Sequence, residues 1–182
     1  MAKITRRSLV NISAAGLTGC AGAHKGPWRH FTAEEGRLLE LICEQIVPTD
    51  KDPGAREAGA AQYIDRQLAK RLKAFAEHYR KGLSAIQGAS RELRGRNFEQ
   101  LAWAERTAVL KAVEAGKVNQ ANWPKRSSRW FFSVVRDHTI EGVFSHPRHG
   151  GNRDLAGYRL LGWEYPEPRG QNRYTDPRFR KT

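Results

Sequence analysis

Apolar residues recur every three to four positions over most of this chain, and this spacing is what most limits its fold. The first such stretch follows Phe31, where Thr32 and Glu35 are placed to form a capping box. It ends at Pro48, which cannot continue a helix. No stretch alternates convincingly between apolar and polar residues, as a half-buried strand would. The spacing therefore predicts an all-α fold.

Further helical stretches are separated by segments of turn-forming residues. The helical spacing covers 57–69, 72–86, a short turn at 97–101, 105–115, and a last stretch from 127 or 128 to about 140. A loop is expected at 48–55, a break at 88–95, and a helix end at Gly116. Because 182 residues suffice for one core, we expect a single compact multi-helix domain.

The chain changes character after the last helical stretch. Residues 142–152 are rich in glycine and predict an irregular loop, which Phe144 indicates is pinned to the core. Residues 164–182 hold several prolines and few aliphatic side chains, so we expect an extended basic tail, free or lying on a partner. The helical domain would then span 31–163, after a linker at 24–30.

The first 23 residues have the layout of a bacterial export signal. Arg6 and Arg7 precede a weakly apolar stretch at 9–19, and no acidic residue occurs before Glu34. The stretch is shorter than the roughly 20 residues that a transmembrane helix needs. The paired arginines resemble a twin-arginine signal, which predicts export to the periplasm.

Two processing sites are compatible with this leader. Ala21-Gly22-Ala23 fits a signal peptidase site, which would leave His24 as the first mature residue. Leu17-Thr18-Gly19-Cys20 instead resembles a lipobox, in which the thiol of Cys20 receives a lipid. The second reading predicts a lipoprotein anchored to the membrane.

The formal net charge of +13 admits nucleic acid, an anionic membrane or an acidic protein as partner. Lys3, Arg6 and Arg7 supply three of these charges, so +10 remains after cleavage at either site. The other basic residues are scattered over the helical stretches. No single stretch has the concentrated basic face of a helix that binds in a groove of DNA. We therefore expect no nucleic acid, and an acidic subunit or an anionic membrane instead.

The sequence carries no recognisable catalytic motif. It has no Gly-x-Gly-x-x-Gly after a strand, no phosphate-binding loop, no His-Glu-x-x-His and no Cys-x-x-Cys. Its two cysteines, Cys20 and Cys43, are too few for a disulfide scaffold or a four-ligand zinc site. Cys43 lies in an apolar helical stripe and is expected to be buried. We expect no catalytic residue and no cofactor or metal in this chain.

Three histidines leave one alternative open. His146 and His149 lie three residues apart, and His138 could join them if the fold brought it near. Such a site would make the chain an independent periplasmic metal-binding or redox protein. The simpler interpretation is a surface loop whose histidines bond to the backbone.

Several short motifs follow one another in a fixed order. They are Phe31 with its helix, Ile46-Val47-Pro48-Thr49-Asp50, Pro53-Gly54-Ala55, Gly59 with Tyr63-Ile64-Asp65, Tyr79-Arg80-Lys81-Gly82-Leu83, Phe98 to Leu101, Phe131-Phe132, Thr139-Ile140-Glu141-Gly142, and Pro147-Arg148-His149-Gly150-Gly151-Asn152 followed by Gly162-Trp163. Over about Phe31 to Pro166 this series resembles the gluconate 2-dehydrogenase subunit 3 family. The chain has His149 where a tyrosine is common, and Ala104 where a capping Ser or Thr is expected.

The resemblance implies a non-catalytic small subunit. In such complexes a large glucose-methanol-choline-type flavoprotein with FAD oxidises a sugar, sugar acid or alcohol, and a cytochrome subunit with haem c passes on the electrons. The small subunit binds the flavoprotein and supplies its export signal, and the complex or a lipid anchor associates with the membrane. The candidate partner interface is formed by the tail and by Pro147, Gly150, Gly151, Asn152, Gly162 and Trp163.

Overall fold

The computed structural model describes residues 28–163, and every regular element in this range is helical. The α-helices are α1 (Ala33–Ile46), α2 (Ala60–Leu68), α3 (Ala76–Arg94), α4 (Trp103–Glu114), α5 (Ser128–Phe144) and α6 (Ala156–Leu160). Short 3-10 turns occur at Lys73–Phe75, Phe98–Gln100, Pro124–Arg126, Pro147–His149 and Arg153–Leu155. The prediction of an all-α domain is confirmed.

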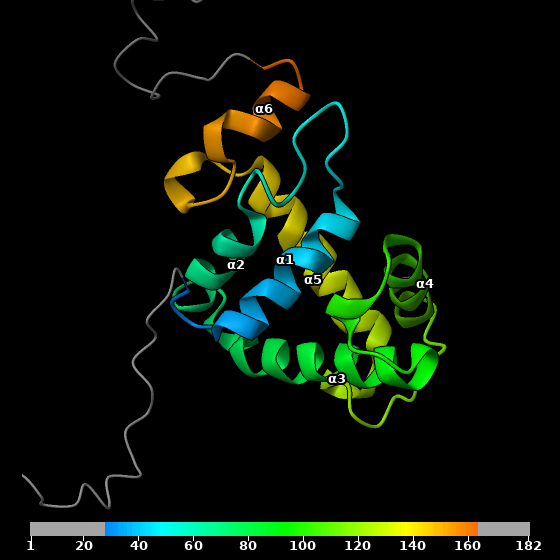
Figure 1. The fold of residues 1–182 in the computed structure, drawn as a ribbon. Helices are drawn as coiled ribbons and strands as arrows, with labels where there is room; N and C mark the ends of the chain where they lie inside the picture. The colour runs from blue at the N-terminus through cyan, green and yellow to red at the C-terminus, as the bar shows by residue number, and fades with distance from the viewer. Residues whose placement is uncertain (1–27, 164–182) are drawn as a thin grey trace, which may run out of the picture.

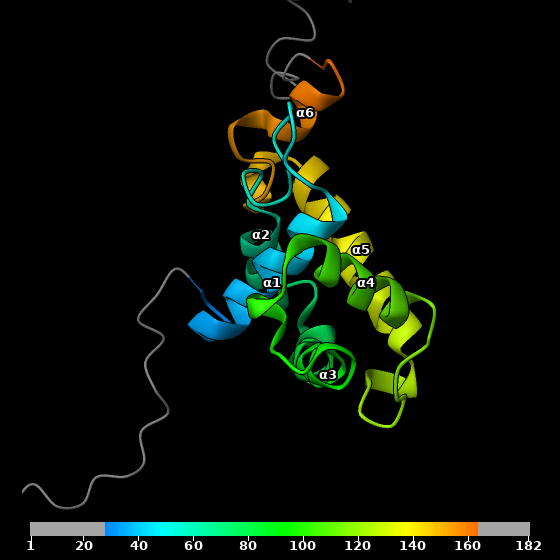
Figure 2. The ribbon, with the colours of Figure 1, turned by 45° about the vertical axis from the view of Figure 1, so that its right-hand side comes forward.

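Helix α5 is the centre of the packing and contacts α1, α2, α3, α4 and α6. Helix α3 crosses one end of the molecule, and α6 lies at the opposite end, beside the loop between α1 and α2 (Figures 1 and 2). The core between these ends is filled by aromatic side chains that are fully buried: Phe31, Tyr79, Phe98 and Phe131. The ring of Phe131 lies directly on the backbone of α3 at Gly82, where a Cβ atom would overlap it.

The predicted start of the first helix is confirmed. The Thr32 hydroxyl accepts a hydrogen bond from the Glu35 amide at 3.1 Å, and the Glu35 carboxylate accepts one from the Thr32 amide at 2.9 Å. Each partner satisfies a backbone donor that the first turn of a helix leaves free. Phe31, just before the cap, is fully buried and anchors the entry of the chain.

The predicted break at 88–95 is wrong. Helix α3 continues through Gly88 to Arg94 and ends at Gly95, which has φ of 70°. Ala85 and Ala89 are buried on the inner face of this helix, so packing offsets the cost of a glycine inside it.

Three helix starts also differ from the prediction. The stretch expected from 72 opens with the 3-10 turn Lys73–Phe75, and α3 begins at Ala76. Helix α2 begins at Ala60, because Gly59 has a left-handed backbone. Helix α4 begins at Trp103 with Ala102 as its N-cap, so Ala104 lies inside the helix and needs no capping side chain. The Glu105 carboxylate accepts the Ala102 amide at 2.9 Å.

The expected loop at 142–152 is shorter than predicted. Helix α5 runs on to Phe144, which packs against the core, and a 3-10 turn follows at Pro147–His149. Helix α6 was not predicted. Among the described helices, none combines the length and the apolar character that crossing a membrane requires.

Candidate functional site

The candidate site combines predicted residues with others that the fold brings to them. Arg6, Arg7 and Cys20 lie outside the described residues, as does the tail at 164–182. The structure describes the other predicted positions, which are Pro147, Gly150, Gly151, Asn152, Gly162 and Trp163.

The glycine-rich loop folds back onto the last turn of α5. It leaves the helix through the turn Pro147–His149, and the next residue, Gly150, has φ of 96°, which side chains with a Cβ rarely adopt. The Asn152 amide then donates to the carbonyl oxygen of Gly142 at 2.8 Å. A Cβ atom on Gly151 would overlap that same oxygen. The loop reaches α5 this closely only because position 151 is glycine.

Asn152 is fully buried and joins the loop to α6. Its backbone is left-handed, a conformation that asparagine tolerates better than most residues. Its Oδ1 accepts a hydrogen bond from the Gly157 amide at 2.8 Å, and Gly157 in turn lies against the carbonyl group of Val143. Its Nδ2 is buried without an acceptor among the described residues. Asn152 therefore fixes α6 on the end of α5.

Gly162 and Trp163 close α6 with a Schellman motif. The Trp163 amide donates to the Tyr158 carbonyl at 2.8 Å, and the Gly162 amide donates to the Arg159 carbonyl at 3.0 Å. Gly162 has the left-handed backbone that this motif needs, and the rings of Trp163 and Tyr158 lie 6.1 Å apart. The motif holds Leu161 and Trp163 outward, with exposed fractions of 51% and 62%.

The loop also rests on α2. Pro147 opens the 3-10 turn, where its missing amide is not needed. Gln67 Nε2 donates to the His149 carbonyl at 3.2 Å. The Arg66 guanidinium lies over Gly150, where a Cβ atom would overlap it. Sequence reasoning missed Arg66 and Gln67, because spacing along the chain does not show which helix a loop packs on.

The loop between α1 and α2 is ordered by a buried carboxylate. Glu44 accepts hydrogen bonds from the amides of Thr49 and Arg56 at 2.9 and 3.0 Å. The Arg153 amide donates to the Ala58 carbonyl at 3.0 Å and ties this loop to the segment before α6. Two of the motifs that carry the resemblance therefore meet at the α6 end of the molecule (Figure 2).

The histidines of the metal alternative are not gathered into one site. The His138 ring lies in the core with its Nδ1 2.9 Å from the Tyr79 hydroxyl, and burial lowers the pKa of His138. The rings of His146 and His149 lie 6.3 Å apart on the loop. Residues 28–163 contain no group of three His, Cys, Asp or Glu side chains placed to hold a metal ion. Nothing in this part of the chain supports the alternative.

Cys43 has the surroundings of a packing residue. It is fully buried, and desolvation raises the pKa of its thiol to about 12, so it is protonated at neutral pH. A haem of the c type is bound through two cysteines, and Cys43 is the single cysteine in the described range. These residues therefore do not fit a covalently bound haem.

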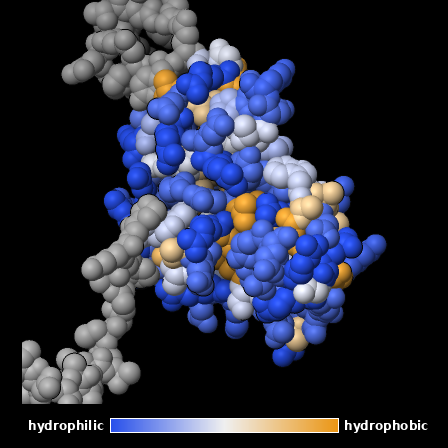
Figure 3. All heavy atoms as spheres, in the orientation of Figure 1, coloured by the Kyte–Doolittle hydropathy of each residue, from blue (hydrophilic) through white to orange (hydrophobic). Residues whose placement is uncertain are grey.

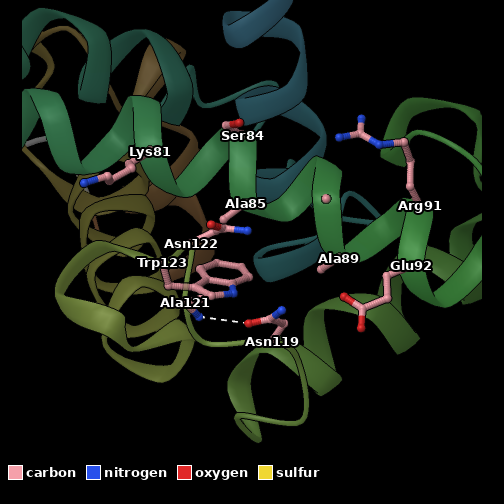
Figure 4. Close-up of a pocket in the computed structure, with 11 residues that line it drawn as sticks. Lys81, Ser84, Ala85, Ala89, Arg91, Glu92, Asn119, Ala121, Asn122 and Trp123 are labelled. Carbon is pink, nitrogen blue, oxygen red and sulfur yellow. Dashed lines mark hydrogen bonds between the residues drawn. The ribbon is translucent and has the colours of Figure 1, made fainter.

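A cavity of about 490 Å³ lies between α3 and the segment that connects α4 to α5. In Figure 4 Lys81 and Glu92 of α3 lie on either side of the Trp123 ring, with Asn119 below the ring and Asn122 between the ring and α3. The Asn119 side chain accepts a hydrogen bond from the Ala121 amide at 3.0 Å and so shapes the connecting segment. The lining of this cavity contains no histidine, cysteine or tyrosine. It therefore offers no pair of a nucleophile and an imidazole base.

Replacing Gly151 by alanine is expected to lower the free energy of unfolding by about 2–3 kcal/mol, because the new methyl group would push the loop off α5. Gly88 is the matched control. It lies inside α3 with nothing near its Cβ position, so Gly88→Ala is expected to raise the same quantity by about 0.5–1 kcal/mol. Urea titrations of the two variants measure both effects. Equal stability of Gly151→Ala and the wild type would contradict the packing described here.

The comparison with known families agrees with this placement of the motifs. A family model described as gluconate 2-dehydrogenase subunit 3 matches residues 33–165, which is more than half of the chain. The matched region includes the loop between α1 and α2, the glycine-rich loop and α6. No curated protein and no solved structure matches the chain.

Proposed function

The chain belongs to the gluconate 2-dehydrogenase subunit 3 family, and on this premise we propose that it is the non-catalytic small subunit of a periplasmic, membrane-associated flavoprotein dehydrogenase. The catalytic subunit would carry FAD and oxidise a sugar, sugar acid or alcohol, and a cytochrome subunit with haem c would accept the electrons. This chain would bind the flavoprotein and direct its export through Arg6 and Arg7.

The observation that best supports a binding role is the apolar corner, which we define as Leu161, Trp163 and the Tyr158 ring beneath Trp163. A few hydrophobic atoms are visible at the α6 end of the molecule in the space-filling view (Figure 3). Large apolar side chains that are exposed do not stabilise the isolated domain. Tryptophan is over-represented at the centres of protein interfaces. The Schellman motif fixes the corner before any partner arrives, so little order has to be gained on binding.

In such a complex this chain would have a structural role and not a catalytic one. FAD would supply the hydride acceptor within the catalytic subunit, and no residue of this chain is assigned to that reaction. What the described residues would contribute is a rigid end, built by Asn152, Gly151 and the capped α6, on which the flavoprotein rests.

Replacing Leu161 and Trp163 together by serine is expected to reduce the flavoprotein that co-purifies with the tagged chain by at least about tenfold, since a buried tryptophan anchor is worth roughly 2 kcal/mol or more. The measurement is the FAD recovered per mole of small subunit after co-expression with the candidate catalytic subunit. A second variant that ends at Trp163 tests the tail separately.

Trp103 provides the matched control for this experiment. It is exposed to 50% on α4, at a different part of the molecule, so Trp103→Ser is expected to leave co-purification unchanged (Figure 1). The melting temperature of each variant shows whether the domain is still folded. Full recovery of the flavoprotein by a folded Leu161→Ser, Trp163→Ser variant would contradict the assignment of the corner.

A further inference from the structure

A group of cations lies where the end of α2 meets the 3-10 turn after α5. This basic face consists of the cations Arg66, Lys70, Arg71 and Arg148, with the imidazole of His149 beside them. In Figure 1 the turn lies beside α2, and the contacts of α2 with this turn agree.

Several contacts hold the basic face together. The Arg148 Nε donates to the His149 Nε2 at 3.2 Å, and the Gln67 side chain holds the His149 carbonyl. The Arg66 guanidinium lies over Gly150, and Lys70 and Arg71 follow just after the end of α2. The face therefore joins residues of α2 to residues far away in the sequence.

The positive charge of this face is balanced only in part. Arg71 forms an ion pair with Glu141 at 2.6 Å and also donates to the Tyr63 hydroxyl. Within residues 28–163, Arg66, Lys70 and Arg148 have no such carboxylate partner. Like charges held at close range repel one another, so an acid that docks here would gain from every one of them.

We propose that the basic face is a docking surface for an acidic segment of a protein partner, rich in Asp and Glu. Three of its cations are arginines, whose planar guanidinium groups bind carboxylates through paired hydrogen bonds. Arg71 already binds one carboxylate of this chain, that of Glu141. This proposal goes beyond the apolar corner, and it does not depend on which subunit supplies the acids.

A protein partner fits this face better than a bilayer does. Surfaces that bind anionic membranes usually place apolar side chains beside the cations, and these side chains enter the lipid. Leu68 and Leu72, the large apolar residues that flank Lys70 and Arg71 in the sequence, are both buried. A segment of carboxylates needs no such insertion, because it meets the cations at the surface.

The test uses the full chain and a fluorescein-labelled peptide of ten glutamates, with binding followed by fluorescence anisotropy at low salt. The wild type is expected to bind the peptide, and rising NaCl is expected to weaken the complex. The double variant Lys70→Gln, Arg148→Gln is expected to bind about five to ten times more weakly, since each exposed pair contributes up to about a factor of five. Both side chains are exposed, so the fold should persist.

The control variant is Lys111→Gln, Lys117→Gln, which removes the same charge from exposed positions on α4 and just after it. Its peptide affinity is expected to stay within about twofold of the wild type. Equal losses in the two double variants would overturn the proposal, because only net charge would then matter. Failure of the wild type to bind the peptide would also overturn it. So would the finding that binding to phosphatidylglycerol vesicles depends on Lys70 and Arg148 while binding to the peptide does not.

Discussion

Replacing Asp65 by alanine is expected to lower the free energy of unfolding by about 3–5 kcal/mol. Asp65 lies on α2 with an exposed fraction of 1%. Its carboxylate accepts hydrogen bonds from the amides of Arg29, His30 and Phe31 at 2.7, 2.8 and 3.1 Å. Alanine would leave these donors without an acceptor and release the segment that leads into α1.

Urea unfolding followed by far-UV circular dichroism measures this loss. Asp137 is the matched control, since its carboxylate lies in an exposed pair with Arg136 and Asp137→Ala should change stability by less than about 0.5 kcal/mol. Asp65→Asn keeps one acceptor oxygen and is expected to fall between the two. A loss under about 1 kcal/mol for Asp65→Ala would show that water replaces the carboxylate easily and that these contacts matter little.

The consequence of this contact reaches beyond stability. The segment that Asp65 binds is where the described domain begins, next to residues 1–27, which contain the proposed export signal. Trp28 is buried and packs against Gly36 of α1. A leader attached to this segment is therefore attached to a folded core, as an escort for a preassembled complex would require.

Helices with local signals could be predicted from the sequence. The capping box at Thr32 and Glu35 depends on neighbours in the chain, and both its hydrogen bonds are present. Helix α6 could not be predicted, because it has only five residues and follows Asp154 and Leu155, both with left-handed backbones. Its place is set by the hydrogen bond from the Gly157 amide to Asn152 and by the close approach of Gly157 to the Val143 carbonyl of α5.

The candidate site was predictable to a similar extent. The resemblance singled out Gly151 and Asn152, but spacing could not reveal that Gly142 is the group they pack against. Gly142 is a glycine inside a helix, which costs stability and so could have pointed to a close contact. Leu161 and Arg66 left no such signal, since exposure and charge balance are properties of the folded surface.

Replacing Arg6 and Arg7 by lysine is expected to keep the flavoprotein in the cytoplasm. Lysine preserves both positive charges, so the variant removes only the paired guanidinium groups that twin-arginine export would recognise. FAD is inserted into a folded protein in the cytoplasm, and the twin-arginine route carries folded cargo, so one signal would serve both subunits. The measurement is the flavoprotein activity in periplasmic and cytoplasmic fractions of cells that express both chains.

Lys3→Arg is the control, since it exchanges the same two side chains in the opposite direction outside the pair and should leave export unchanged. The Leu161→Ser, Trp163→Ser variant keeps the signal and separates binding from export. If the chain is an escort, this variant should reach the periplasm while the flavoprotein stays behind. Wild-type amounts of periplasmic flavoprotein with the Arg6→Lys, Arg7→Lys chain would refute the escort role and leave the binding role intact. In the proposed function, export therefore depends on Arg6 and Arg7, and binding of the flavoprotein depends on Leu161 and Trp163.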